Sequence, residues 1–295
     1  MAYRIGIDSG GTHVVASLYD ENKHLIASST KGSGNILLNP EQTVKNILAS
    51  IENVLPNKEI NCSLILAGIA GLETISDPQP YLDKITTSLK NICNNVHFIS
   101  DAKLALISNL KGQDGFLAIA GTGSIVYGKQ NNRYLRSGGW GYLLGDYASG
   151  YRISQEALSS ALIVYDEGEK FSFTQEIFDF FKVASYEELV AKYYKLTRPE
   201  IAKFATVVDK LAISGNIDAV LILKHQASLL AHEITSLINR YQDNITQNLA
   251  LSGSVLKNSS IVQTEVISLV QRSYPEMKII MSDENNNSAV NYYQN

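Results

Sequence analysis

IGIDSGGT, residues 5–12, is the stretch that decides the fold. Residues 3–8 alternate as a half-buried strand does, and the small residues Ser9-Gly10-Gly11 supply a turn. Two more short apolar runs follow, at 13–19 and 25–29, separated by a polar turn. We therefore predict an antiparallel meander of three strands at the start of the chain.

The residues after the meander predict alternating helices and strands. Pro40 suits the first turn of a helix, and the apolar residues that follow it share one face. An apolar run at 63–67 predicts a buried strand, which a helix at about 80–92 and a strand at 96–100 follow. The predicted order of this half is β-β-β-α-β-α-β.

The second half of the chain repeats this order. Strands are predicted at 116–120, 124–129 and 134–137, and later a strand at 248–251, a helix at 261–273, a strand at 277–281 and a final helix. Between them lies a long helical stretch, about 148–241, interrupted near Gly168, Ser185, Pro199 and Gly215. A duplicated unit predicts two α/β domains, 1–112 and 113–295, with a helical insertion in the second and a last helix that is a candidate to pack on the first. We expect the two glycine turns to face each other across an interdomain cleft.

Composition excludes several classes of protein. The 295 residues are 45% hydrophobic and 18% charged, with a net charge of -4, which is typical of a globular chain of two domains. The sequence has no basic cluster of the kind that binds nucleic acid, and no apolar stretch of the ~18 residues that a membrane span needs. Gly6 and Asp8 come before an apolar signal-peptide region can form, so a cytoplasmic location is the default expectation.

The cysteines and histidines do not predict a metal site. Cys62 and Cys93 form no C-x-x-C pair and are interpreted as reduced thiols. His225 and His232 share a helical face, but no third ligand is spaced to join them.

Both predicted glycine turns are candidates for phosphate binding. Gly10, Gly11 and Thr12 in the first half match Gly121-Thr122-Gly123 in the second. Glycines let a ligand approach the backbone closely, and their N–H groups can cradle a phosphate. Asp8 ends the first strand, where its carboxylate can hold a metal-bound water. The alternative is a pair of plain hairpins, the first needing φ > 0 at Gly10 and Gly11.

Three other segments carry candidate site residues. Asp101 follows a buried strand and is placed to accept a proton from a hydroxyl, although Ser100 and Asp101 are also standard helix-capping residues. The loop 137–146 holds the only Trp and several glycines, which suits a sugar; the alternative is a buried Trp inside an irregular loop. Ser252 and Gly253 follow a strand, where a turn would contact a nucleoside or simply lead into a helix.

These segments together resemble the N-acetylglucosamine kinase family, which is related to the BadF/BadG/BcrA/BcrD-type ATPases of the actin/hexokinase/Hsp70 superfamily. The motifs that carry the resemblance are IGIDSGGT, SDA, IAGTGS, GGWGYLLGD and LSGSV. The resemblance implies two RNase H-like domains that bind ATP, Mg²⁺ and an amino sugar, and a homodimer. It implies Asp101 as catalytic base and Asp8 as support for the metal, through water. It also implies a set of sugar-binding residues: Asn35, Gly71, Gly139, Trp140, Gly141 and Asp146.

Two departures from the family pattern affect what the resemblance implies. The family usually reads Gly-Asp-Glu-Gly-Ser where this chain has Tyr147 after Gly145-Asp146, which puts the contacts to the sugar in doubt. The family's last helix usually opens with a Gly-Ala turn near the adenine, but Asn285–Ala289 stands here instead. The adenine pocket is therefore also in doubt.

The sequence leads to one main hypothesis and two alternatives. The main hypothesis is an ATP-dependent kinase acting on the 6-hydroxyl of an amino sugar, foremost N-acetylglucosamine, with glucosamine and N-acetylmuramate open. The alternatives are an iron–sulfur activator ATPase of a dehydratase, and a sugar- or nucleotide-binding protein with impaired catalysis. The sequence does not decide which amino sugar is used or the oligomeric state.

Overall fold

The computed structural model of the protein describes residues 2–55, 62–241, 245–281 and 285–294. The chain divides into two compact units: unit 1 is Met1–Asp114 with Ser282–Asn295, and unit 2 is Gly115–Met281. The sequence predicts a boundary after residue 112 and assigns all of 113–295 to the second domain. The same prediction names the last helix as a candidate to pack on the first domain, and in the structure the C-terminal segment belongs to unit 1, where residues 286–291 pack on its sheet.

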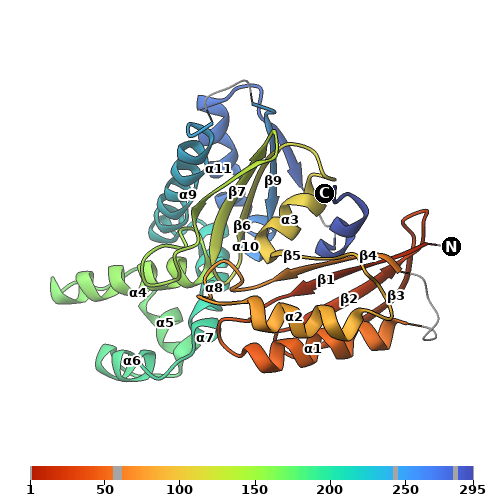
Figure 1. Ribbon diagram of the computed structural model, residues 1–295. Helices are drawn as coiled ribbons and strands as arrows, with labels where there is room; N and C mark the ends of the chain where they lie inside the picture. The colour runs from red at the N-terminus through yellow and green to blue at the C-terminus, as the bar shows by residue number, and fades with distance from the viewer. Residues whose placement is uncertain (1, 56–61, 242–244, 282–284, 295) are drawn as a thin grey trace. The chain divides into compact units, whose positions relative to one another are not determined.

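Unit 1 is built on a mixed five-stranded sheet in the order β3-β2-β1-β4-β5. The first three strands form the predicted antiparallel meander, while β4 and β5 run parallel to β1. Its elements are β1 (Tyr3–Ser9), β2 (Val14–Tyr19), β3 (Leu25–Lys31), α1 (Pro40–Val54), β4 (Cys62–Ile69), α2 (Gln79–Leu89), β5 (Val96–Ser100), α3 (Asp101–Asn109) and the 3-10 helix η1 (Asn286–Asn291). Figure 1 shows α1 and α2 lying along one face of this sheet.

Helices cover both faces of the unit 1 sheet, so β4 is apolar and buried along most of its length. In β4, Ile65 and Ala67 pack into the cluster that includes α1, whereas Leu64 and Leu66 pack with α3 and η1. Two glycines in the sheet allow α3 and η1 to pack closely against it. A Cβ at Gly68 would lie 2.5 Å from the Cβ of Leu104 in α3, and one at Gly6 would overlap the backbone of Asn287 in η1. The final helix predicted from the sequence is thus a short 3-10 turn pressed against β1.

Unit 2 repeats the topology of unit 1. Its sheet has the order β10-β9-β6-β7-β8, which read in reverse matches the order of the first sheet. The elements are β6 (Gly115–Ala120), β7 (Ser124–Gln130), β8 (Arg133–Gly138), α4 (Gly150–Asp166), α5 (Thr174–Phe181), α6 (Tyr186–Tyr193), α7 (Arg198–Ala202), α8 (Ala205–Ile213), α9 (Ile217–Ile238), β9 (Asn248–Ser252), α10 (Ser254–Asn258), α11 (Ser260–Ser273) and β10 (Lys278–Met281). The predicted duplication and the helical insertion, α4 to α9, are confirmed.

The insertion belongs to the core of unit 2. Its long helix α9 packs against β7, β8 and α11, and Figure 1 shows α9 and α11 side by side. Rings from α5 meet the ring of Phe204, which is fully buried: the Phe180 and Phe181 centroids lie 5.1 and 5.2 Å from its own. The insertion is therefore held by apolar packing, and it can present side chains to a site from a rigid support.

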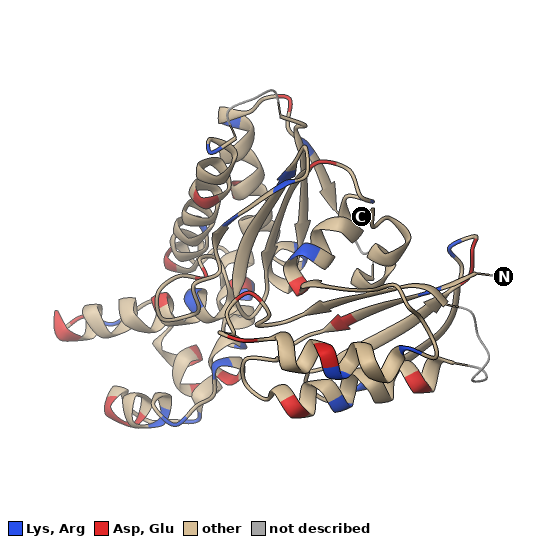
Figure 2. Cartoon of the chain, viewed as in Figure 1, with Lys and Arg blue, Asp and Glu red and all other residues tan. Residues whose placement is uncertain are grey.

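Charge is spread over each unit. Figure 2 shows acidic and basic residues interspersed along the helices. Among the described residues, no helix combines the length and the apolarity needed to span a bilayer.

Candidate active site

The first glycine turn joins β1 to β2 and leaves open space above its backbone. The Gly10 N–H donates to the His13 carbonyl at 2.9 Å, and Gly34 N–H donates to the Gly10 carbonyl at 2.8 Å. Neither Gly10 nor Gly11 has a positive φ, so the hairpin alternative, which required one, is wrong on this point. A Cβ at Gly11 would meet no atom within 4 Å. The fold itself therefore does not demand glycine here, whereas close approach of a ligand would.

Two carboxylates of unit 1 lie near this turn and influence each other. Asp8, in β1, accepts a hydrogen bond from the Asn286 side-chain amide at 2.9 Å. Burial raises the pKa of Asp8 above its usual range. For Asp101, burial and then the Asp8 charge raise the pKa to about 6. A carboxyl group with a pKa close to neutral is well matched to accepting a proton.

Capping of α3 is carried out mainly by Ser100, the N-cap residue. Its hydroxyl accepts the Lys103 N–H at 3.4 Å, while Asp101 is the first helical residue and its carboxylate accepts the Ala102 N–H at 2.9 Å. Asp101 therefore takes part in the hydrogen bonding at the start of α3 without being its N-cap residue, and its role as a base stays a prediction.

Asn35 and Gly71, both predicted to contact a sugar, are neighbours in unit 1. Asn35 bridges to Ala70, and its side-chain oxygen accepts the N–H groups of Leu37 and Leu38 at 3.0 and 3.4 Å. Gly71 has φ +80°, and a Cβ there would lie 2.6 Å from the Asn35 Oδ1. These contacts fix the Asn35 amide and leave its NH₂ group, a double donor, without a partner in the described part of the chain.

The loop 138–146 of unit 2 carries an exposed aromatic ring. Trp140 is 65% exposed, so the alternative of a buried Trp is wrong. The Arg136 guanidinium lies 4.1 Å from its ring centroid and donates to the Gly138 carbonyl at 3.0 Å. Gly139 and Gly141 have positive φ, at 66° and 89°. The loop therefore holds the ring in place from one side and leaves it open to a ligand.

Asp146 ends this loop, but its carboxylate is turned inward. It is 3% exposed and accepts a hydrogen bond from Arg198 Nη2 at 2.7 Å. The backbone N–H groups of Ser124 and Gly141 also bond to it. Burial raises the pKa of Asp146, against the opposing effect of Arg198. The predicted contact with a sugar stays a prediction; the contacts in the structure join the loop to the second glycine turn.

Tyr147, which replaces the family Glu, faces a cation. Its ring centroid lies 5.6 Å from the Arg152 guanidinium. The next residue, Ala148, has φ +57° and donates its N–H to the Gln226 side chain at 2.9 Å. Since Ser149 then caps α4, the backbone here is tied down although the acidic side chain is absent.

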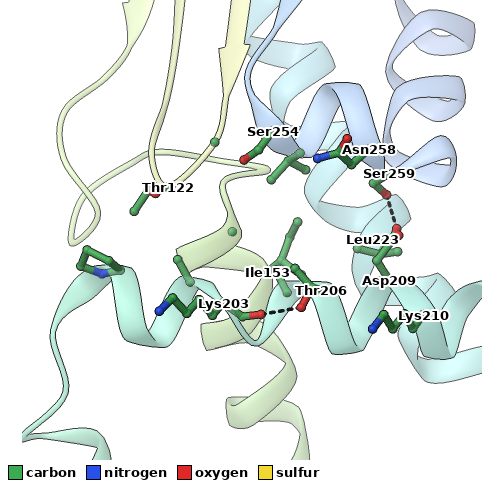
Figure 3. Close-up of a pocket in the computed structure, with 16 residues that line it drawn as sticks. Thr122, Ile153, Lys203, Thr206, Asp209, Lys210, Leu223, Ser254, Asn258 and Ser259 are labelled. Atoms are coloured by element: carbon green, nitrogen blue, oxygen red, sulfur yellow. Dashed lines mark hydrogen bonds between the residues drawn. The ribbon is translucent and has the colours of Figure 1, made fainter. Parts of the chain in front are cut away.

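The second glycine turn forms one end of a cavity of about 390 Å³ in unit 2 (Figure 3). The Gly121 carbonyl accepts the Gly150 N–H at 2.7 Å, which anchors the turn to the start of α4. The lining residues come from this turn, α4, the insertion helices α7 to α9, and α10: Gly121, Thr122, Gly150, Ile153, Pro199, Ala202, Lys203, Ala205, Thr206, Asp209, Lys210, Leu223, Ser254, Val255, Asn258 and Ser259.

The cavity has the mixture of surfaces that a nucleoside needs. Apolar side chains such as Ile153 and Leu223 lie beside polar ones, and Asp209 accepts the Ser259 hydroxyl at 2.5 Å. In Figure 3 Thr122 lies at one end, and Asp209 with Lys210 lies toward the other. A volume of this size with few placed polar groups is typical of a small-molecule site.

Ser252 and Gly253, the residues predicted for nucleotide contact, lie just before the cavity wall. Gly253 has φ +91°, and a Cβ there would overlap the Ala120 backbone, so glycine is needed for packing. The cavity is lined by Ser254, the next residue. The sequence gives no signal for Thr206 and Asp209 of α8 or for Asn258 of α10, since these residues belong to no motif and the two helices are far apart in the chain.

The comparisons with known proteins identify the family. Residues 5–286 match the model of the BadF/BadG/BcrA/BcrD ATPase family. The chain belongs to this family. It is 33% identical over 291 residues to an N-acetylmuramic acid/N-acetylglucosamine kinase of Clostridium acetobutylicum, covering 95% of this chain and 94% of that one. It is 28% identical over 296 residues to an N-acetyl-D-glucosamine kinase of Dictyostelium discoideum, covering 94% and 92% of the two chains.

Solved structures share the fold of this BadF/BadG/BcrA/BcrD ATPase family member. One from Chromobacterium violaceum, proposed to be an N-acetylglucosamine kinase, has a TM-score of 0.74 at 19% identity and covers 100% of this chain and 99% of that one. A ROK family glucokinase from Streptomyces griseus, solved with glucose and AMPPNP, has a TM-score of 0.62 at 16% identity, with 98% and 97% covered. The expected family and α/β fold class are confirmed.

Proposed function

We propose that the protein is an ATP-dependent amino-sugar kinase that phosphorylates N-acetylglucosamine on its 6-hydroxyl. The observation that carries this proposal is Asp101, a largely buried carboxylate with a pKa of about 6 at the start of α3. The activities of the two curated relatives support an amino sugar as acceptor. Membership of an ATPase family supports ATP as phosphoryl donor.

In the proposed reaction, Asp101 accepts the proton of the sugar hydroxyl as that oxygen attacks the terminal phosphorus of ATP. General base catalysis of this kind contributes roughly 10²–10⁴-fold to a rate. The O–P bond to the sugar forms, the bond to the ADP oxygen breaks, and the proton stays on Asp101 until product leaves. Asn35 and the loop bearing Trp140 are proposed to bind the sugar, whose apolar face suits the exposed ring.

The nucleotide is proposed to occupy the cavity of unit 2. Its phosphates would lie at Gly121–Gly123, the turn at one end of the cavity, and its nucleoside would extend toward Asp209 and Asn258. Gly10, Gly11 and Thr12 are proposed to contribute further phosphate contacts from unit 1. Positioning and charge stabilisation supply most of the catalysis in phosphoryl transfer.

The residues present fit an Mg²⁺ ion that arrives with ATP. No group of three or more His, Cys, Asp or Glu side chains able to hold a metal occurs among the described residues. Mg²⁺ in such enzymes needs only one or two carboxylates, since substrate phosphates and water complete its shell. Asp8 would hold it, through water, and the ion would neutralise charge on the β- and γ-phosphates.

A coupled ADP-release assay across a panel of sugars tests this function. We expect turnover with N-acetylglucosamine, and the panel includes N-acetylmuramic acid, glucosamine and glucose. NMR of the product would place the phosphate on the 6-hydroxyl. No sugar-stimulated ADP release with any member would instead favour the alternative of a sugar- or nucleotide-binding protein with impaired catalysis.

The iron–sulfur activator alternative has little structural support. Cys62 and Cys93 are each 4% exposed and lie in the apolar core of unit 1. A thiolate that ligates a cluster at a subunit interface would need to reach the surface. Iron in purified protein would revive this alternative. The homodimer and the cytoplasmic location remain predictions, and light scattering in solution tests the first.

A further inference from the structure

Arg198 lies where the second glycine turn, the loop 138–146 and the insertion meet. It is the first residue of α7, and its Nη2 donates to the buried Asp146 at 2.7 Å. The same group lies against the Cα of Gly123, since a Cβ there would overlap it. The guanidinium carbon is also 5.3 Å from the ring centroid of Tyr142. All of these residues belong to unit 2.

Neutralising Asp146 uses only a small part of what this side chain offers. A guanidinium has five N–H donors, and Arg198 makes one hydrogen bond within the described part of the chain. Its Nε is buried without a partner there, although the side chain as a whole is 33% exposed. Asp146 is already bonded to the N–H groups of Ser124 and Gly141. The pair therefore leaves donors and an exposed edge for another acceptor.

The position of Arg198 suits a phosphate acceptor. Gly123 follows Thr122, which lies at one end of the cavity in Figure 3, and Pro199, next to Arg198, lines the same cavity. A guanidinium presents a rigid planar fork that matches phosphate oxygens two at a time. Its charge does not depend on pH in the range where enzymes work, because the pKa of arginine exceeds ~12.

We propose that Arg198 binds the terminal phosphate groups of the nucleotide and is held in place for this by Asp146. The inference rests on the proposed function, which puts those phosphates at Gly121–Gly123. Asp146 then has a definite role, because its carboxylate orients the guanidinium and ties the loop 138–146 to the nucleotide site. The insertion has a role as well, since α7 delivers a cation to the glycine turn.

Calorimetric binding of MgATP, MgADP and adenosine to Arg198→Met tests the phosphate contact. We expect MgATP to bind about 10- to 100-fold more weakly than to wild type, while adenosine binding changes less than about twofold, because a lost charge-assisted contact affects only phosphate. The MgATP affinity of Arg198→Lys should lie between those of wild type and Arg198→Met, since lysine keeps the charge but lacks the planar fork of donors. The matched control is Lys195→Met, which should bind all three ligands as wild type does. Lys195 is an exposed cation three residues earlier, and its side chain makes no hydrogen bond or ion pair in the described structure.

A double variant separates the phosphate contact from a structural role. Arg198→Met alone leaves a buried carboxylate unpaired, so its melting temperature should fall; adding Asp146→Asn should recover much of it. The inference predicts that the double variant regains stability but still binds MgATP weakly. Recovery of MgATP affinity in the double variant, or unchanged affinity in Arg198→Met, would overturn it. If wild type binds none of the three ligands, the proposed function fails first, which is a distinguishable result.

Discussion

Replacing Asp101 with Asn should give an enzyme that is inactive yet more stable at neutral pH. The side chain keeps its shape but loses its charge and its capacity to accept a proton. If Asp101 is the base, kcat should fall by roughly 10²–10⁴-fold. Sugar binding, measured by calorimetry, should change little. The kinetic and the stability effects come from the same cause, which is burial of a carboxylate beside Asp8.

The size of the stability effect follows from the pKa of Asp101. Its rise from the ordinary value of 3.8 to about 6 corresponds to about 3 kcal/mol at 1.36 kcal/mol per pKa unit. Because the folded state holds this proton more tightly than the unfolded state, the contribution of Asp101 to stability is fully present below pH 3.8 and is lost as pH rises through about 6. Asn carries no such cost, so Asp101→Asn should melt about 2–6 °C above wild type at pH 7.5, for a chain of this size.

Scanning calorimetry at several pH values, beside the ADP-release assay, measures both effects. The gain in melting temperature should shrink toward pH 4, where wild type is itself protonated. The control is Asp83→Asn on α2, an exposed carboxylate for which no gain is expected. A variant with near-normal kcat would refute the role of base. A variant less stable than wild type at pH 7.5 would refute the argument from burial.

Three further predictions concern other parts of the site. Trp140 is the only Trp and is 65% exposed, so its fluorescence should respond to added N-acetylglucosamine. Trp140→Ala should raise the KM for sugar about tenfold or more without lowering the melting temperature. Gly11→Ala should fold normally but bind MgATP more weakly, because a Cβ there meets no protein atom within 4 Å. Gly123→Ala should be destabilised, because its Cβ would overlap Arg198 and lie 2.7 Å from Asp146 Oδ2. Melting curves with and without nucleotide distinguish the two variants. Glu233 lies in α9, where burial and then the Asp146 charge raise its pKa to about 7. The melting temperature of Glu233→Gln should therefore increase relative to wild type as pH rises from 6 to 8. An equal difference between the two proteins at both pH values would contradict this.

The sequence by itself determined the fold class and the strands of both units, whereas it did not predict α10 and gave a helix where the structure has the 3-10 turn η1. Strands and helices follow from apolar periodicity and from glycine and proline positions, which act over a few residues. The repeat of one order of elements predicted two sheets of the same topology. The breaks predicted in the insertion lie close to helix boundaries: Gly168 and Gly215 follow helices, Ser185 caps the start of α6, and Pro199 is in the first turn of α7.

Only the tertiary structure decided which groups are free to act. Ser100 and Asp101 are equivalent as local capping signals, but the structure makes Ser100 the N-cap residue and places the Asp101 carboxylate where the charge of Asp8 raises its pKa. Asp146 looked like a residue that faces a ligand, but Arg198, 52 positions away, turns its carboxylate inward. The cavity likewise is lined by residues of both α8 and α10, which are far apart in the sequence. Such contacts depend on long-range packing, which places residues together without leaving a periodic pattern in the chain.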